Sequence, residues 1–293
     1  MRPIIDLIFR SAIGYTQMKN HYNPESKPKP SILVTDLDGT LIPLTDNAEN
    51  TEALLSLNKE HNQNKFKLIF ATGRSYNSVI KAIETLHLPT PEWMICDVGT
   101  SIYQNIGGRF ERLQDYETHL ADKVGIDNRA SIESSLHTIA QLELQEPGSQ
   151  QRFKISYQCA GEDLQPLVGQ INQLLQTKSW PLACMGSIDP FLDKGLIDIL
   201  PVGVNKSYAV LWLSAYAHFN ADEVIYAGDS GNDYAALIAG FRAILVANAS
   251  TGLAEQVQQG LKKIEKLDYL FQANKVATSG VLEGCEYFRL FDE

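Results

Sequence analysis

Residues 32–40 read Ile-Leu-Val-Thr-Asp-Leu-Asp-Gly-Thr, so a short apolar run leads directly into two carboxylates, Asp36 and Asp38. A short apolar run that ends in a turn is typical of a strand buried inside a sheet. Open α/β sheets bind their ligands at the carboxyl ends of their strands. The stretch therefore predicts a pair of acids at the ligand-binding edge of such a sheet.

A second acidic loop lies far along the chain, where the apolar residues 224–227 lead into Gly-Asp-Ser-Gly-Asn-Asp at 228–233. Two distant strand ends can thus supply one acidic site. One carboxylate can attack phosphorus to form an aspartyl-phosphate, and another two residues away can act as acid and base. Because crowded carboxylates and a phosphate dianion repel one another, the site requires a divalent cation, and an all-oxygen ligand set favours Mg²⁺.

Two further motifs lie between these acids. Residues 68–75 read Leu-Ile-Phe-Ala-Thr-Gly-Arg-Ser, an apolar strand that ends in Thr72 and Gly73. The threonine hydroxyl and the nearby backbone amide can hold a phosphoryl group. Lys206 precedes a helical pattern and offers an ammonium group as counter-charge to a phosphate.

Each motif also has a simpler interpretation. Residues 36–40 suit an ordinary turn, because Asp and Gly favour turns. Thr72 could cap the helix that begins near Ser75. Lys206 could be a solvated surface lysine, since lysine is rarely fully buried. The presence of the other motifs in order along the chain favours the functional interpretation of each.

In this order the four motifs resemble those of the haloacid dehalogenase superfamily of phosphohydrolases, over roughly residues 31–288. The resemblance implies Asp36 as nucleophile and Asp38 as general acid and then base, with Thr72 and Lys206 holding the phosphoryl group. It further implies Mg²⁺ bound by Asp36, by the backbone carbonyl of Asp38 and by Asp229. It places Asp233 in the outer shell of the metal and gives Asn232 the role of positioning the phosphate or the lysine.

The alternation of strands and helices predicts an α/β fold with a parallel sheet, helices on both of its faces and an inserted α+β part. The resemblance implies that the sheet is a Rossmann-like core and that the inserted part is a cap domain of type C2. We expect strands at 32–35, 67–71 and 93–96, and helices at 50–58 and 76–86. The inserted part should contain a helix at 117–142, a strand at 152–157, a helix at 164–176 and strands at 182–188 and 196–200. The core should resume with a helix at 208–217, a strand at 223–227, a helix at 234–239 and a strand at 243–246.

These elements divide the chain into three parts. Residues 31–115 and 201–293 form the predicted phosphatase core, and residues 116–200 form the predicted cap that selects the substrate. Residues 1–30 form an N-terminal extension. A cap inserted between the second and third motifs resembles the superfamily branch that contains sugar-phosphate phosphatases.

Within that branch, the closest likeness is to the sucrose-phosphate phosphatase family. The segments that carry the likeness are residues 71–76, 98–103, 154–157, 198–201 and 228–233. Two positions depart from the usual pattern of that family: Gly39 stands where asparagine is usual, and Ser207 where glycine is usual. The resemblance implies a sugar phosphate as substrate, and sucrose 6-phosphate is the one we expect.

The candidate substrate contacts form two groups. Thr72, Gly73, Arg74 and Lys206 are candidates for the phosphate, and Gly99, Thr100, Ser101 and Lys154 for the sugar. Thr100 and Ser101 could equally belong to an ordinary loop, and Lys154 could be an exposed charge on a strand. Other functions also fit: a phosphatase of another glycosyl phosphate such as mannosylfructose phosphate, a phosphomutase, or a regulatory domain that binds a sugar phosphate.

Composition agrees with this interpretation. The 293 residues include 25 basic and 35 acidic side chains, and the net charge of −10 argues against a nucleic-acid partner. The four cysteines are widely spaced, which favours reduced thiols and a cytoplasmic protein. No stretch is typical of a signal peptide or a membrane span. We expect a monomer, with a sugar-phosphate synthase as the protein partner to consider.

Overall fold

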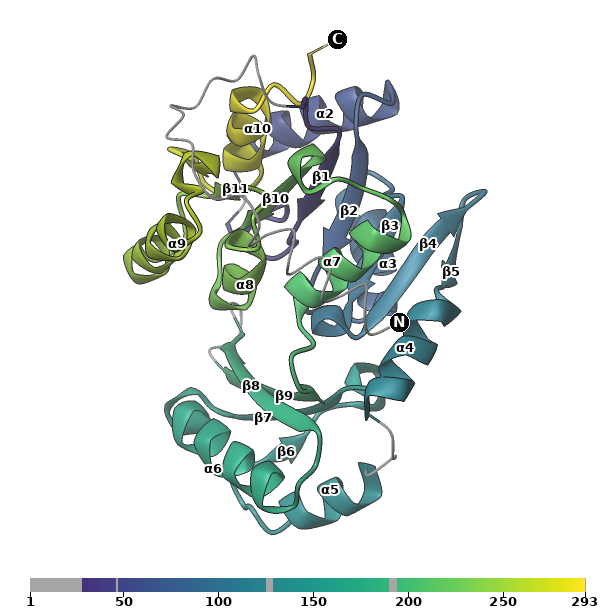
Figure 1. The fold of residues 1–293 in the computed structure, drawn as a ribbon, viewed down its shortest axis with the longest axis vertical. Helices are drawn as coiled ribbons and strands as arrows, with labels where there is room; N and C mark the ends of the chain where they lie inside the picture. The colour runs from purple at the N-terminus through teal and green to yellow at the C-terminus, as the bar shows by residue number, and fades with distance from the viewer. Residues whose placement is uncertain (1–27, 46, 125–128, 190–193, 293) are drawn as a thin grey trace.

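The structure is a computed structural model that describes residues 28–45, 47–124, 129–189 and 194–292. The predicted extension therefore lies outside the described residues, except for its last three. In the larger sheet, the strands lie side by side in the order β12 (Leu270–Gln272), β11 (Arg242–Leu245), β10 (Val224–Gly228), β1 (Ile32–Thr35), β2 (Lys67–Ala71), β3 (Trp93–Cys96), β4 (Ser101–Ile106) and β5 (Arg109–Arg112) (Figure 1). Neighbouring strands from β12 to β3 are parallel, whereas β4 and β5 pair antiparallel at one edge.

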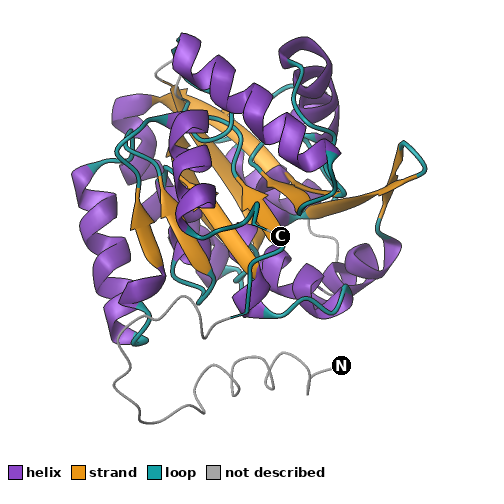
Figure 2. Cartoon of the chain, turned by 90° about the horizontal axis from the view of Figure 1, so that it is seen from above, coloured by secondary structure: helices purple, strands orange, loops and turns teal. Residues whose placement is uncertain are grey.

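Helices cover both faces of this sheet (Figure 2). Successive side chains of a strand point to opposite faces, so Val34 and Leu33 belong to different apolar clusters. The cluster of Val34 includes residues from α4 (Gln114–Val124), α7 (Lys206–Tyr216), α8 (Tyr234–Leu237) and α9 (Thr251–Lys263). The cluster of Leu33 includes residues from α2 (Ala48–Asn62), α3 (Tyr76–Leu86) and α10 (Ala277–Tyr287). Burial on both faces explains why the central strands read as continuous apolar runs.

A second, antiparallel sheet, here named the cap sheet, contains β6 (Glu143–Leu144), β7 (Ile155–Ala160), β9 (Lys194–Pro201) and β8 (Leu182–Ile188), in that spatial order. Helices α5 (Arg129–Leu136) and α6 (Leu164–Thr177) cover one of its faces with a separate apolar cluster. Figure 1 shows the cap sheet between these two helices and the larger sheet. Its other face is therefore turned toward the larger sheet.

The predicted α/β fold class is confirmed, and several elements have the bounds that were expected, such as β1, β2, β3 and α3. Most of the remaining expected elements begin or end a few residues away from the observed ones, and the larger differences are the following. The helix predicted for residues 117–142 is replaced by α4, which ends at Val124, and α5, which ends at Leu136. The strand predicted for 152–157 is β7, which begins at Ile155, and the antiparallel hairpin of β4 and β5 was not expected.

Two further findings bear on the expectations about membranes and cysteines. Within the described ranges, no helix combines the length and apolar character needed to cross a bilayer. Cys96, Cys159, Cys184 and Cys285 are all free and buried. The thiols thus contribute to the apolar interior, as the spacing in the sequence indicated.

Candidate active site

The two acidic loops meet because β1 and β10 are adjacent, parallel strands. The backbone N–H of Asp36 donates a hydrogen bond to the carbonyl of Ala227 over 3.0 Å, which joins the two strand ends. Carboxylate oxygens of Asp36, Asp229 and Asp233 all lie within 4.8 Å of one another. The predicted acidic site is therefore assembled from segments far apart in the sequence.

Gly39 allows the first loop to approach the second closely. It has a φ of +80°, and a Cβ atom built at this position would lie 2.3 Å from Oδ2 of Asp229. Only glycine fits such a contact without displacing the carboxylate. The next residue, Thr40, donates its hydroxyl to Oδ1 of Asp229 over 2.9 Å. The Gly-Thr pair thus brings the backbone to Asp229 and orients its carboxylate.

Lys206 lies between two of the acids. Helix α7 begins at this residue, because the side chain of Asn205 caps the helix by accepting the N–H of Tyr208. The Lys206 Nζ atom is 2.8 Å from Oδ1 of Asp36 and 2.9 Å from Oδ1 of Asp233. With an exposed fraction of 0%, Lys206 is not a solvated surface lysine, so that interpretation is wrong. Burial lowers the pKa of its ammonium, but Asp233 and Asp36 outweigh it and raise the pKa, so the group is charged.

The acids carry more negative charge than one ammonium can offset. Burial, reinforced by Asp233, holds the pKa of Asp36 well above its usual range despite Lys206. Burial followed by Asp233 raises the pKa of Asp229 to about 6. Carboxylate oxygens are hard ligands, and an excess of negative charge in a buried site favours a divalent cation. The residues present therefore fit Mg²⁺.

Asp233 is held by donors on both of its oxygens. Oδ2 accepts hydrogen bonds from the N–H groups of Asp229 and Ser230, over 3.3 and 3.1 Å, and from the Ser230 hydroxyl over 3.1 Å. Oδ1 accepts from Lys206 and from the hydroxyl of Tyr226. An ionised carboxylate has about four acceptor sites. Asp233 is therefore saturated, which suits a group that orients its neighbours. The predicted Asn232 lies beside it, and its Oδ1 accepts from the Ser230 hydroxyl over 3.0 Å.

Asp38 stands apart from the three-acid cluster and pairs with Arg74. Its Oδ2 accepts from Nε of the arginine over 2.8 Å, and its Oδ1 accepts from the second guanidinium nitrogen over 2.5 Å. A bidentate pair of this kind fixes the positions of the two groups relative to each other. Arg74, a candidate phosphate ligand, thus lies against the expected acid and base.

Thr72 is buried and directly follows β2, and Gly73 and Arg74 come next in the chain. Its hydroxyl accepts the N–H of Arg74 over 3.1 Å. The following helix, α3, has Ser75 at its N-cap. Thr72 therefore does not cap that helix, and this simpler interpretation is wrong.

A second polar cluster joins the cap sheet to the larger sheet. The Nζ atom of Lys154 is 3.7 Å from Oδ1 of Asp97 and 3.6 Å from Oδ1 of Asp198. Asp97 follows β3, whereas Asp198 lies on β9 and accepts the hydroxyl of Ser156 over 2.6 Å. Lys154 has an exposed fraction of 4%, so the interpretation as an exposed strand charge is wrong.

The other candidate sugar contacts lie in the segment between β3 and β4 and at the start of β4, whose first residue is Ser101. Gly99 has a φ of +97°, and a Cβ atom there would lie 2.2 Å from the carbonyl oxygen of Asn205, the residue before Lys206. The hydroxyl of Thr100 donates to the Asp97 carbonyl over 2.9 Å. Ser101 accepts a hydrogen bond from Arg112 over 3.1 Å. The close approach of Gly99 to Asn205 therefore places this segment against the start of α7.

Some residues of the two clusters were not singled out in the sequence. Asn248 donates its side-chain amide to the Gly39 carbonyl over 2.8 Å and to Oδ2 of Asp229 over 3.1 Å. It lies beyond the end of β11, and Asp97 follows β3. The rule that located Asp36, a polar residue just after a buried strand, would have found both.

Comparisons with known proteins show which proteins the chain is similar to. The family model described as sucrose-6F-phosphate phosphohydrolase matches residues 29–289. A HAD-like hydrolase of Nitrosococcus oceani is 35% identical over 268 residues, which cover 88% of this chain and 71% of that protein. The mannosylfructose-phosphate phosphatase of Agrobacterium fabrum is 27% identical over 262 residues, which cover 88% of this chain and 97% of that protein.

A solved structure shares the fold. The sucrose-phosphatase from Synechocystis sp. PCC6803, in complex with sucrose and phosphate, superposes with a TM-score of 0.73 at 24% identity. The match covers 89% of this chain and 99% of that one. The core and the cap sheet thus have the arrangement of a known phosphatase.

Proposed function

The chain belongs to the sucrose-6F-phosphate phosphohydrolase family of HAD-like phosphatases, and we propose that it hydrolyses a sugar phosphate through an aspartyl-phosphate on Asp36. The observation that carries this proposal is the contact of Lys206 with Asp36 inside the three-acid cluster. A buried ammonium next to one carboxylate oxygen leaves the other oxygen available for attack on phosphorus, and it can neutralise charge on the transferring group.

In the proposed reaction the carboxylate of Asp36 attacks phosphorus, and Asp38 protonates the leaving sugar oxygen. Asp38 then takes a proton from the water that hydrolyses the aspartyl-phosphate. The acid step requires a proton on one oxygen of Asp38, which would donate to the leaving oxygen while the carboxyl can still accept from Arg74. Thr72, Gly73, Arg74 and Lys206 are the proposed phosphate contacts.

We propose that Asp36, the backbone carbonyl of Asp38 and Asp229 hold Mg²⁺, with Asp233 in its outer shell. A bound divalent cation neutralises charge on the phosphate and on the acids. Asn232 is proposed to position the phosphate or Lys206. The saturated hydrogen bonding of Asp233 supports its outer-shell role, because such groups orient the direct ligands.

Binding of Mg²⁺ should weaken as the pH falls. Burial raises the pKa of Asp229 to about 6, and only the ionised form binds metal, so the proton competes with the cation. A change from about pH 7 to about pH 5 should lower the apparent Mg²⁺ affinity at least about tenfold, because Asp229 takes up a proton over this range and the raised pKa of Asp36 adds to the competition. Calorimetric titration of the protein with Mg²⁺ at several pH values measures the effect. An affinity independent of pH over this range would contradict the assignment of Asp229 as a ligand.

For the substrate we propose a sugar phosphate, with sucrose 6-phosphate as the first choice. Residues 116–200 would form the cap that selects it. Lys154 and Asp198 on the cap side face Asp97 on the core side, and buried charged groups of this kind can hydrogen-bond sugar hydroxyls. Gly99 and Thr100 directly precede β4, and Ser101 is its first residue. A sugar-phosphate synthase, whose product would be this substrate, remains the partner to test.

Replacing Lys154 by methionine should impair the use of sugar phosphates selectively. The side chain of methionine keeps the apolar stem but removes the charge between Asp97 and Asp198. We expect the KM for the sugar phosphate to rise about tenfold to a hundredfold, while hydrolysis of p-nitrophenyl phosphate, which has no sugar, changes less than about twofold. Steady-state kinetics with both substrates measure this. Arg152→Met removes an exposed charge of the cap and is the matched control. Equal losses on both substrates would contradict a role in sugar recognition.

The proposed function is tested by phosphate release from a panel of sugar phosphates, with Mg²⁺ or with a chelator. Mg²⁺-dependent preference for sucrose 6-phosphate would support the proposal. Preference for mannosylfructose phosphate would keep the proposed mechanism and change the proposed substrate. This compound belongs in the panel because one relative is a mannosylfructose-phosphate phosphatase. Transfer of phosphate within the sugar would indicate a phosphomutase. Tight binding without turnover would refute the enzymatic proposal and indicate a regulatory domain.

A further inference from the structure

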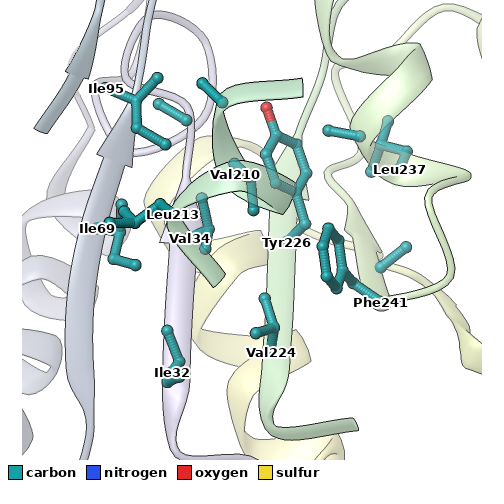
Figure 3. Close-up of a cluster of buried hydrophobic side chains, with 14 of the residues drawn as sticks. Ile32, Val34, Ile69, Ile95, Val210, Leu213, Val224, Tyr226, Leu237 and Phe241 are labelled. Atoms are coloured by element: carbon teal, nitrogen blue, oxygen red, sulfur yellow. The ribbon is translucent and has the colours of Figure 1, made fainter. Parts of the chain in front are cut away.

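Tyr226 has a polar atom at the edge of an apolar core. It lies on β10 with an exposed fraction of 0% and belongs to the same cluster as Val210, Leu237 and Phe241. Figure 3 shows the ring among these side chains, with its oxygen pointing away from Val224 at the start of the strand. The hydroxyl therefore lies at the edge of this cluster, near the end of β10 that leads to the acidic loop.

The hydroxyl donates a hydrogen bond to Oδ1 of Asp233 over 2.7 Å. Burial, followed by the charge of Asp233, holds the pKa of Tyr226 well above its usual range, so the hydroxyl keeps its proton. The same Oδ1 accepts from Nζ of Lys206 over 2.9 Å. A carboxylate oxygen has about two acceptor sites, so the tyrosine takes one and Lys206 takes the other.

This arrangement fixes where the ammonium group can lie. Lys206 has three N–H donors, of which one points to Asp233 and one to Asp36, 2.8 Å away. The third is left for the transferring phosphoryl group. Without the tyrosine hydroxyl, Oδ1 of Asp233 would have a free acceptor site, and the ammonium could then shift away from Asp36, although the three donors to Oδ2 would still hold the carboxylate. A flexible ammonium would stabilise charge in the transition state less well.

We propose that Tyr226 is a positioning residue for phosphoryl transfer, which acts through Asp233 to hold Lys206 against Asp36. The inference rests on the proposed function, because it assigns Lys206 to the phosphoryl group. In the sequence, Tyr226 lies within an apolar run and is interpreted as a core residue. Its hydroxyl gives it a second role that the ring alone would not have.

The test is Tyr226→Phe, which keeps the ring in the core and removes only the hydroxyl. The matched control is Tyr269→Phe. Tyr269 is also buried and donates to an aspartate oxygen over 2.7 Å, but its partner Asp222 precedes β10, at the opposite end of the strand from the acidic loop. Both variants thus lose the same kind of bond, and only one of them loses it at the site.

We expect Tyr226→Phe to lower kcat about tenfold with less than about a twofold change in KM, because the ammonium is needed most in the transition state. Inhibition by vanadate, which adopts the five-coordinate geometry of the transferring group, should weaken more than inhibition by inorganic phosphate. Tyr269→Phe should leave kcat and the ratio of the two inhibition constants unchanged.

A kcat of Tyr226→Phe within about twofold of that of the unmodified protein would overturn the inference. A loss of kcat shared equally by Tyr269→Phe, or one without a change in the ratio of vanadate to phosphate inhibition, would also overturn it, because a purely structural effect would produce either. Absence of turnover in the unmodified protein would instead refute the proposed function, and the inference with it.

Discussion

Asparagine in place of Asp36 is expected to reduce turnover by on the order of 10⁴-fold or more, as the loss of a nucleophile does in other enzymes. An amide is a poor nucleophile toward phosphorus and cannot form the acyl-phosphate. The amide oxygen can still accept a hydrogen bond from Lys206, so the arrangement of the site should persist. Single-turnover measurement of phosphate release determines the effect. Retention of full turnover would contradict the mechanism.

The same substitution should not destabilise the metal-free protein. Burial and Asp233 hold the pKa of Asp36 well above its usual range, which means that folding disfavours the ionised carboxylate. A neutral amide removes this cost, so the melting temperature in chelator should be unchanged or higher. Active sites commonly lower the stability of the folded state in this way. A loss of stability together with activity would show that Asp36→Asn disrupts the fold, and its low turnover would then say nothing about the nucleophile.

Lys206→Met is expected to have the second largest effect, on both activity and stability. It removes the ammonium group that Asp36 and Asp233 share, and all three side chains are buried. Removing one partner of a buried ion pair costs about 3–5 kcal/mol, and losing a charge that stabilises the transition state lowers kcat by about 10²- to 10³-fold. Unfolding in urea and steady-state kinetics measure the two effects.

The loss of stability in Lys206→Met should be larger at neutral pH than in mild acid. Asp36, whose pKa is held above its usual range by burial and by Asp233, can take up a proton in mild acid, which relieves its repulsion with Asp233 when the lysine is absent. Lys275→Met is the control, because Lys275 pairs with Glu49 on the surface. That substitution should leave stability and activity unchanged. A Lys206→Met protein as stable and active as the control would contradict the assigned role of Lys206.

The elements that could be predicted are those whose apolar sequence pattern corresponds to residues that are buried in the structure. Strands β1, β2 and β3 are covered on both faces, so their residues form apolar runs with clear ends. The hairpin of β4 and β5 was missed because it lies at the edge of the sheet, where polar and charged side chains such as Arg109 and Glu111 remain exposed. The helix expected at 117–142 was predicted too long, since α5 ends at Leu136. Helical propensity alone does not show where a helix ends when tertiary packing determines its length.

Some residues of the candidate site could likewise be predicted from the sequence, and others could not. The acids at strand ends and Thr72 could be located because a polar residue directly after a buried strand is typical of a ligand-binding edge. Lys206 could be located because it precedes a helical pattern and the last acidic motif. The burial of Lys206 and Lys154 could not be predicted, since it depends on partners more than 25 residues away in the chain, such as Asp233 and Asp198. The role of the Tyr226 hydroxyl could not be predicted for a different reason. The ring of Tyr226 fits the apolar core, and only the three-dimensional structure shows that its hydroxyl contacts Asp233.

The central claim is that Asp36 carries the phosphoryl group during turnover. The most direct measurement is to quench the protein with acid while it hydrolyses the preferred sugar phosphate, digest it and determine the mass of the peptide that contains Asp36. The account predicts one added phosphoryl group on that peptide in the unmodified protein and none in Asp36→Asn. A phosphoryl group on another residue, or phosphate release by Asp36→Asn at the unmodified rate, would contradict it.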